Sequence, residues 1–102
     1  MKAEYPIRLN NDEHLICPLC GYDCTHQVAV DVFFRAGEDS KTGFFTRVAG
    51  LSCFIDTLMV NNPSRSRDGI KIKFECECGC KFDMIIIQHK GNTHMWLEEA
   101  DE

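Results

Sequence analysis

Apolar and polar residues alternate along several stretches of the chain, and this alternation predicts β-strands. Residues 26–34 carry apolar side chains at every second position, which is typical of a half-buried strand (Val28, Val30, Val32 and Phe34). Residues 70–76 place apolar side chains on one face and charged side chains on the other. Residues 82–87 (FDMIII) become apolar on both faces, which indicates a central strand, and residues 93–97 predict a last strand.

Segments rich in glycine, proline and polar residues separate these predicted strands. Residues 1–16 predict an irregular or short extended lead-in, and residues 36–43 and 61–69 predict polar connections. Residues 44–60 predict one or two strands, with Gly50 as a break or bulge. Because helical periodicity is weak throughout, we expect an all-β fold with a small antiparallel sheet of about five strands.

The length of 102 residues indicates one domain. We expect residues 1–97 to form it and residues 98–102 to be an acidic disordered tail. That tail holds four of the sixteen acidic residues, so eleven basic residues face twelve acidic ones in the remainder. A domain that grips phosphate backbones is usually basic, and this one is nearly neutral.

Seven cysteines make the cellular compartment important for the interpretation. No apolar run approaches the roughly 20 residues of a bilayer span, and the first fifteen residues contain no apolar signal core. We therefore expect a cytoplasmic protein in a bacterial host, without membrane contact. Since thiols stay reduced there, clustered cysteines favour metal binding over disulfides.

The run Cys17-Pro18-Leu19-Cys20-Gly21 is a specific metal-binding motif, called here the first knuckle. Two residues between the cysteines let both thiolates converge from one tight turn on a tetrahedral zinc ion, with Zn–S bonds of about 2.3 Å. A glycine after the second cysteine permits a positive φ. Cys17 and Cys20 are therefore expected to be ligands.

The second knuckle, residues 76–80, holds three cysteines between two predicted strands. Cys76 and Cys80 are the favoured pair, because Glu77, Cys78 and Gly79 can then form the turn. A Cys76/Cys78 pair needs a tighter chelate and remains the alternative. In the favoured arrangement, Cys78 is a spare thiol beside the site.

One structural zinc ion is expected to join the two knuckles. Closing the loop from Cys20 to Cys76, with 55 residues between them, costs about 3.5 kcal/mol. Structural zinc contributes roughly 10–16 kcal/mol, which exceeds that cost. Four thiolates leave no open coordination position, so we expect a structural ion and no enzymatic activity.

The remaining candidate residues have simpler interpretations. Cys24 and His26 follow the first knuckle and are alternative ligands, although a loop or strand-edge position is favoured. Cys53 stands among apolar residues and is expected in the core.

The two knuckles and their surroundings resemble small zinc-ribbon proteins of bacteriophages and prophages of Gram-positive bacteria. The likeness rests on residues 16–21 and 70–97, above all on Phe74–Phe82 and Gln88–Thr93. In those proteins the second knuckle is similar to Cys-Glu-x-Gly-His-x-aromatic, which implies a ligand at Cys80. The family has no assigned activity, so the resemblance implies a zinc-ribbon fold and a phage source.

Three functions follow as hypotheses. The first is a non-enzymatic module that binds a host or phage protein, since the aromatic residues Phe33, Phe34, Phe44 and Phe45 exceed what a small core can cover; a homodimer is a further possibility. The second is nucleic-acid binding, which requires a contiguous basic surface (Arg65, Arg67, Lys71, Lys73 and Lys81). The third is thiol-redox or metal-handling chemistry at Cys78 and Cys24.

Overall fold

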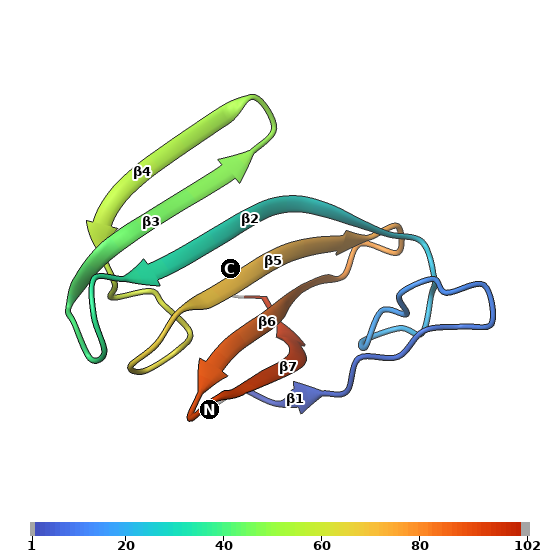
Figure 1. Cartoon of the computed structure of the whole chain (residues 1–102). Coiled ribbons are helices and arrows are strands. Elements are labelled where there is room, and N and C mark those ends of the chain that lie inside the picture. The colour runs from blue at the N-terminus through green and yellow to red at the C-terminus, as the bar shows by residue number, and fades with distance from the viewer. Residues whose placement is uncertain (1, 101–102) are drawn as a thin grey trace.

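The computed structural model describes residues 2–100 and shows one antiparallel sheet of seven strands (Figure 1). The strands follow one another without helices in this part of the chain: β1 (Glu4–Tyr5), β2 (Thr25–Arg35), β3 (Thr42–Ala49), β4 (Ser52–Leu58), β5 (Gly69–Cys76), β6 (Lys81–His89) and β7 (Asn92–Glu99). Their order in the sheet is β1-β7-β6-β5-β2-β3-β4. No helix that could cross a bilayer is found among residues 2–100.

The all-β antiparallel prediction is confirmed, with two differences in extent. The sheet has seven strands where about five were expected, because residues 44–60 split around Gly50, whose φ is +58°, and because the lead-in adds β1. The predicted acidic tail begins too early: Glu98 and Glu99 belong to β7, where they pair with β6. Residues 101–102 of that tail lie outside the described residues.

One face of the sheet is apolar, as the cross-strand register shows. Side chains directly opposite each other on paired strands lie on the same face. Val30 of β2 opposes Ile72 of β5 and Val48 of β3, and Ile72 opposes Met84 of β6. The same register extends this surface, here called the apolar face, from β7 to β4 (Met95, Met84, Ile86, Ile70, Ile72, Val30, Val32, Phe34, Phe44, Thr46, Val48, Cys53 and Ile55).

The opposite face, here called the charged face, buries two carboxylates, Asp31 and Asp83, each with a longer cationic side chain beside it. Asp31 is 2% exposed and accepts two hydrogen bonds from Arg47, Nε to Oδ1 at 2.6 Å and Nη2 to Oδ2 at 2.7 Å. Asp83 is fully buried, with Lys73 Nζ 3.8 Å from its Oδ1. Buried carboxylates need such partners, because an isolated charge in an apolar interior is strongly destabilising.

A bulge at Val28 separates two parts of β2. Gln27 opposes Phe74 and Ala29 opposes Lys73, so Val28 has no partner on β5. The extra residue reverses the alternation of side chains between the faces. Val28 therefore does not continue the stripe of Val30, Val32 and Phe34 as the sequence pattern predicted.

The loop between β4 and β5 is ordered by hydrogen bonds and by Met59, which is buried against Phe33 and Phe45. Arg35, at the end of β2, donates through its guanidinium to the carbonyl oxygens of Ser40, Ser64 and Arg67. Ser64 is 2% exposed, and its hydroxyl donates to the Gln88 carbonyl at 3.1 Å. The loop predicted from its turn-forming residues is therefore a fixed part of the sheet's end.

The main apolar cluster lies at the other end of the sheet, beside the knuckles (Figure 1). Its buried members are Cys17, Cys76, Phe82 and Leu97, and side chains of the lead-in pack against them (Tyr5, Ile7, Leu15 and Leu19). Phe74 and Phe82 stack with their ring centroids 5.2 Å apart. Two of the predicted metal ligands are thus part of this core.

Candidate metal centre

The first knuckle is a tight turn held by its own backbone. Gly21 N donates to the Cys17 carbonyl at 2.9 Å, and Cys17 N donates to the Tyr22 carbonyl at 2.8 Å. Gly21 has a φ of +80°, a value that favours glycine over residues with a Cβ. The turn therefore brings the two cysteine side chains to the same side of the backbone, as the two-residue spacing predicted.

The second knuckle is the turn that connects β5 to β6. Cys76 N donates to the Cys80 carbonyl and Gly79 N donates to the Cys76 carbonyl, both at 2.8 Å. Gly79 has a φ of +100°. A hairpin between two paired strands thus fixes the second set of sulfur atoms at the same end of the sheet.

Backbone and side-chain contacts hold the two knuckles together. Thr25, which opens β2, pairs with Cys76, and Glu77 N donates to the Cys24 carbonyl at 3.0 Å. His26 Nε2 lies 2.8 Å from Glu77 Oε2. The segment after the first knuckle therefore packs along the second knuckle, so the sheet itself aligns the two turns.

Four sulfur atoms meet between the knuckles. The Sγ atoms of Cys17, Cys20, Cys76 and Cys78 all lie within 4.8 Å of one another. Cys20 Sγ is 3.5 Å from Cys76 Sγ and 2.9 Å from Cys78 Sγ. A tetrahedral shell with metal–sulfur bonds of about 2.3 Å separates its sulfurs by about 3.8 Å. The cluster therefore has the size of a site for one metal ion.

The fourth member of the cluster differs from the preferred prediction. Cys17, Cys20 and Cys76 lie together as expected, whereas Cys78 joins them in the position that we had given to Cys80. The half-buried Cys80 side chain packs against the apolar cluster instead. The sequence left this choice open, because spacing alone does not say which thiol of the second knuckle turns toward Cys20.

The ionisation of the thiols reflects their crowding. Hydrogen bonds from Cys20 and then Cys76 lower the pKa of Cys78 to about 6. Burial raises the pKa of Cys76 to about 12, and the hydrogen bond with Cys78 raises the pKa of Cys20. Cys80 also has its pKa raised to about 12, first by a hydrogen bond with Cys78.

These opposed shifts mean that neighbouring thiols do not all ionise together without a cation. One thiolate is stabilised by the remaining thiol protons, and a second negative charge beside it is unfavourable. A divalent cation removes this penalty and lets all four sulfurs become thiolates. The four clustered cysteines are therefore better suited to bind a metal ion than to remain as free thiols.

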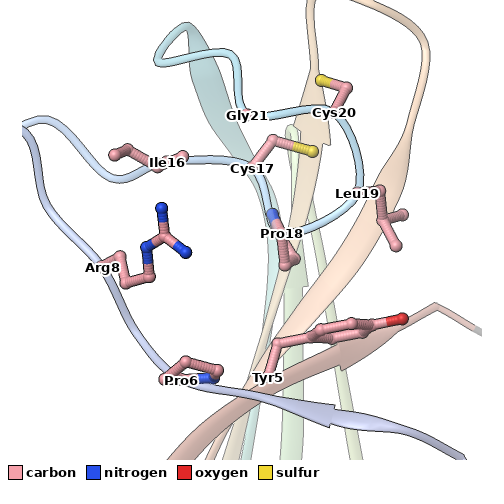
Figure 2. A pocket seen from close by; sticks show the side chains of 9 residues that line it. All are labelled: Tyr5, Pro6, Arg8, Ile16, Cys17, Pro18, Leu19, Cys20 and Gly21. Carbon is pink, nitrogen blue, oxygen red and sulfur yellow. The ribbon is translucent and has the colours of Figure 1, made fainter.

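The site is buried on one side and open on the other. Cys17 and Cys76 are 1% and 4% exposed, whereas Cys20 and Cys78 are exposed. A hollow of about 220 Å³ lies beside the first knuckle, lined by Tyr5, Pro6, Arg8 and residues 16–21. Figure 2 shows the side chains that line it. Within it the Arg8 side chain extends toward Ile16, and the Cys17 sulfur points away from Arg8.

The other candidate residues lie outside the sulfur cluster. His26 is engaged with Glu77, and Cys24 Sγ lies 3.7 Å from Asp23 Oδ1. The prediction that Cys53 lies in the core is wrong: it is exposed on β4, where its Sγ lies 3.5 Å from Thr46 Oγ1. An outer strand of the sheet carries few buried positions, although its residues look apolar in sequence.

In comparisons with known proteins, no family model, no curated protein and no solved structure matches the chain.

Proposed function

We propose that this chain is a non-enzymatic, zinc-stabilised module that binds another protein. The apolar face carries this proposal, because it leaves large side chains open to solvent: Phe34 and Phe44 are 53% and 49% exposed, and Ile55 is 62% exposed. Contiguous exposed apolar surface on a small protein is typical of an interaction site. The metal cluster supplies the rigidity that such a surface requires.

The metal is proposed to be a single Zn²⁺ ion with a structural role. Four thiolates in a tetrahedral arrangement suit zinc, and an all-sulfur shell leaves no open coordination position for a substrate. The ion is held by Cys17, Cys20, Cys76 and Cys78, with Cys80 beside them. Metal analysis of the purified protein tests this directly, with one zinc per chain as the expected result.

Nucleic-acid binding is less well supported than protein binding. It requires free basic side chains on one surface, yet three of the five candidates lie against acidic groups. Arg67 Nη1 is 2.8 Å from Glu38, Lys73 Nζ is 3.8 Å from Asp83, and Lys81 Nζ is 3.9 Å from Glu75. These pairs dilute the positive field that a phosphate backbone would meet.

The source and cellular setting are part of the proposal. The resemblance at residues 16–21 and 70–97 supports a phage or prophage accessory protein that acts in the cytoplasm of a bacterial host. A reducing cytoplasm keeps the cysteines available to the metal. Its partner is then a host or phage protein.

A comparison of three baits tests the binding function. Zinc-loaded wild type, Phe34→Ser and Phe54→Ser are immobilised and exposed to lysate from infected and uninfected Gram-positive cells. Phe34 and Phe54 are both 53% exposed but lie on opposite faces. A protein retained by wild type and Phe54→Ser, and lost with Phe34→Ser, supports the proposal.

The proposal fails if no retained protein distinguishes the two variants. Tight DNA or RNA binding that weakens steeply with salt would replace it with the nucleic-acid function.

A further inference from the structure

No segment within residues 2–100 forms a covering layer over the centre of the sheet on its apolar face. At the end near the metal, the lead-in covers this side of the sheet, where Ile7 and Leu15 pack beside Phe74 and Met84. Farther along the strands, Ile70 and Ile72 belong neither to the main apolar cluster nor to the second buried cluster, which consists of Phe33, Phe45 and Met59. The apolar face therefore extends beyond the part that the chain itself covers.

The alternation in β2 points to a missing layer. Val30, Val32 and Phe34 form the apolar stripe of this strand, yet its most buried side chains are Asp31 and Phe33, on the other face. An alternating strand normally directs its apolar stripe toward a core. Here the stripe faces outward, as it does in a strand whose packing partner is a separate molecule.

The distribution of charge is consistent with a second copy of this chain as the partner. The thirteen side chains that define the apolar face are uncharged, and Glu99 on the same side of the sheet lies at its metal end, opposite Phe82; the ionic pairs Asp31–Arg47 and Lys73–Asp83 lie on the charged face. The chain has a net charge of −5, so two copies repel at long range. Because the apolar face contributes no charge, no like charges meet when two such faces pack together.

The exposed area approaches what a stable dimer needs. Five side chains of this face are about half exposed, and with about 150–250 Å² for a side chain of aromatic size, they offer about 400–600 Å². Two copies would bury about 800–1,200 Å², and partly exposed neighbours such as Ile70 and Ile72 bring this to the low end of specific protein interfaces, about 1,200 Å².

We propose that the apolar face binds a second copy of this chain, with two sheets packed face to face around a two-fold axis. Twisted sheets pack in this way with about 10 Å between them and their inner side chains interdigitated. The surface is rich in β-branched residues, which suits another sheet. This inference rests on the proposed function and narrows its partner: the protein that the apolar face binds is a second copy of the chain.

The test is the molar mass of the metal-loaded full chain, measured by sedimentation from low to high micromolar concentration. Wild type is expected at twice 11.7 kDa and to dissociate on dilution. Phe34→Glu and Val48→Glu each place two charges in a two-fold interface, and are expected to weaken dimerisation at least about a hundred-fold. Phe54→Glu, on the charged face, is expected to leave it unchanged.

Alkylation of Cys53 gives a second measurement that needs no variant. This thiol is exposed and lies on the apolar face opposite Val48. In the proposed dimer its reaction slows as the protein concentration rises, whereas in a monomer its rate stays constant.

The outcomes separate this inference from the proposed function. A wild type that stays monomeric at high micromolar concentration overturns the dimer, and so does a dimer that only Phe54→Glu disrupts. A monomer whose capture of another protein still depends on Phe34 leaves the proposed function in place. A dimer disrupted by Phe34→Glu and Val48→Glu, with zinc content and circular dichroism unchanged, supports the inference.

Discussion

Metal removal is the perturbation that tests the architecture most directly. The knuckles are separated by more than half of the chain, and two of the four clustered sulfurs lie in the main apolar cluster. A chelator that strips the ion should therefore loosen the core and not only the surface turn. We expect the sheet to lose its cooperative unfolding transition.

The magnitude follows from two opposing contributions. A structural zinc site contributes about 10–16 kcal/mol at neutral pH, and closing the loop between Cys20 and Cys76 offsets about 3.5 kcal/mol of this. The net loss on metal removal is then at least about 6 kcal/mol, which is comparable with the total stability of a small domain, about 5–15 kcal/mol.

Urea unfolding followed by Trp96 fluorescence and far-UV circular dichroism measures this loss. Trp96 is half-buried on β7, where it opposes Ile85 of β6, so its emission reports on the sheet rather than on the knuckles. With a slope of about 1–2 kcal/mol per molar urea, the midpoint should fall by at least about 3 M, or the apoprotein should be unfolded without denaturant. Added Zn²⁺ should restore the transition, whereas Mg²⁺ should not.

The reasoning is refuted if the apoprotein and the metal-loaded protein unfold at the same urea concentration. That result would mean that strand pairing alone holds the knuckles together. The four sulfurs would then be neighbours without a structural ion.

Three further predictions concern single positions. Cys78→Ser should weaken zinc binding and Cys80→Ser should not, as measured by competition with a chromophoric chelator; the opposite order would return the fourth ligand to Cys80. Arg47→Met should lower the free energy of unfolding by about 3 kcal/mol in urea titrations, because it leaves the Asp31 carboxylate buried without its guanidinium. The double variant Asp31→Leu/Arg47→Met should recover most of this loss, and a double variant without recovery would exclude the unpaired carboxylate as its cause. Gly43→Ala should lower the free energy of unfolding by about 1–3 kcal/mol, because a Cβ at this position would collide with the Phe34 carbonyl oxygen. Gly37→Ala, where a Cβ meets nothing within 4 Å, should leave it unchanged, and equal thermal stabilities of the two variants would contradict this prediction.

Strand positions could be predicted from the sequence because alternation depends on local residues. The predicted strand at 70–76 lies within β5, and residues 82–87 lie within the longer β6. The direction in which a strand faces could not be predicted. The burial of Asp31 depends on Arg47, sixteen residues later, and a pattern of neighbours does not contain that pairing.

The metal ligands show the same division between local and long-range information. Cys17 and Cys20 were predictable, because their spacing and the following glycine define one turn. The choice between Cys78 and Cys80 depends on how a hairpin turn approaches the first knuckle across the sheet, and the spacing, which favoured Cys80, does not contain that approach. The exposure of Cys53 likewise follows from the place of β4 at the end of the strand order.

Val28, which has no partner on β5, lets one strand meet two requirements on the facing of its side chains that full pairing of all its residues could not meet together. Before it, Thr25 must pair with Cys76 so that the knuckles align; after it, Asp31 must turn toward Arg47. If every residue of β2 were paired in strict alternation, one of these two requirements would fail. Deleting Val28 would remove the need for the bulge, because Gln27 and Ala29 already oppose the consecutive residues Phe74 and Lys73, and a regular ladder would then meet both requirements.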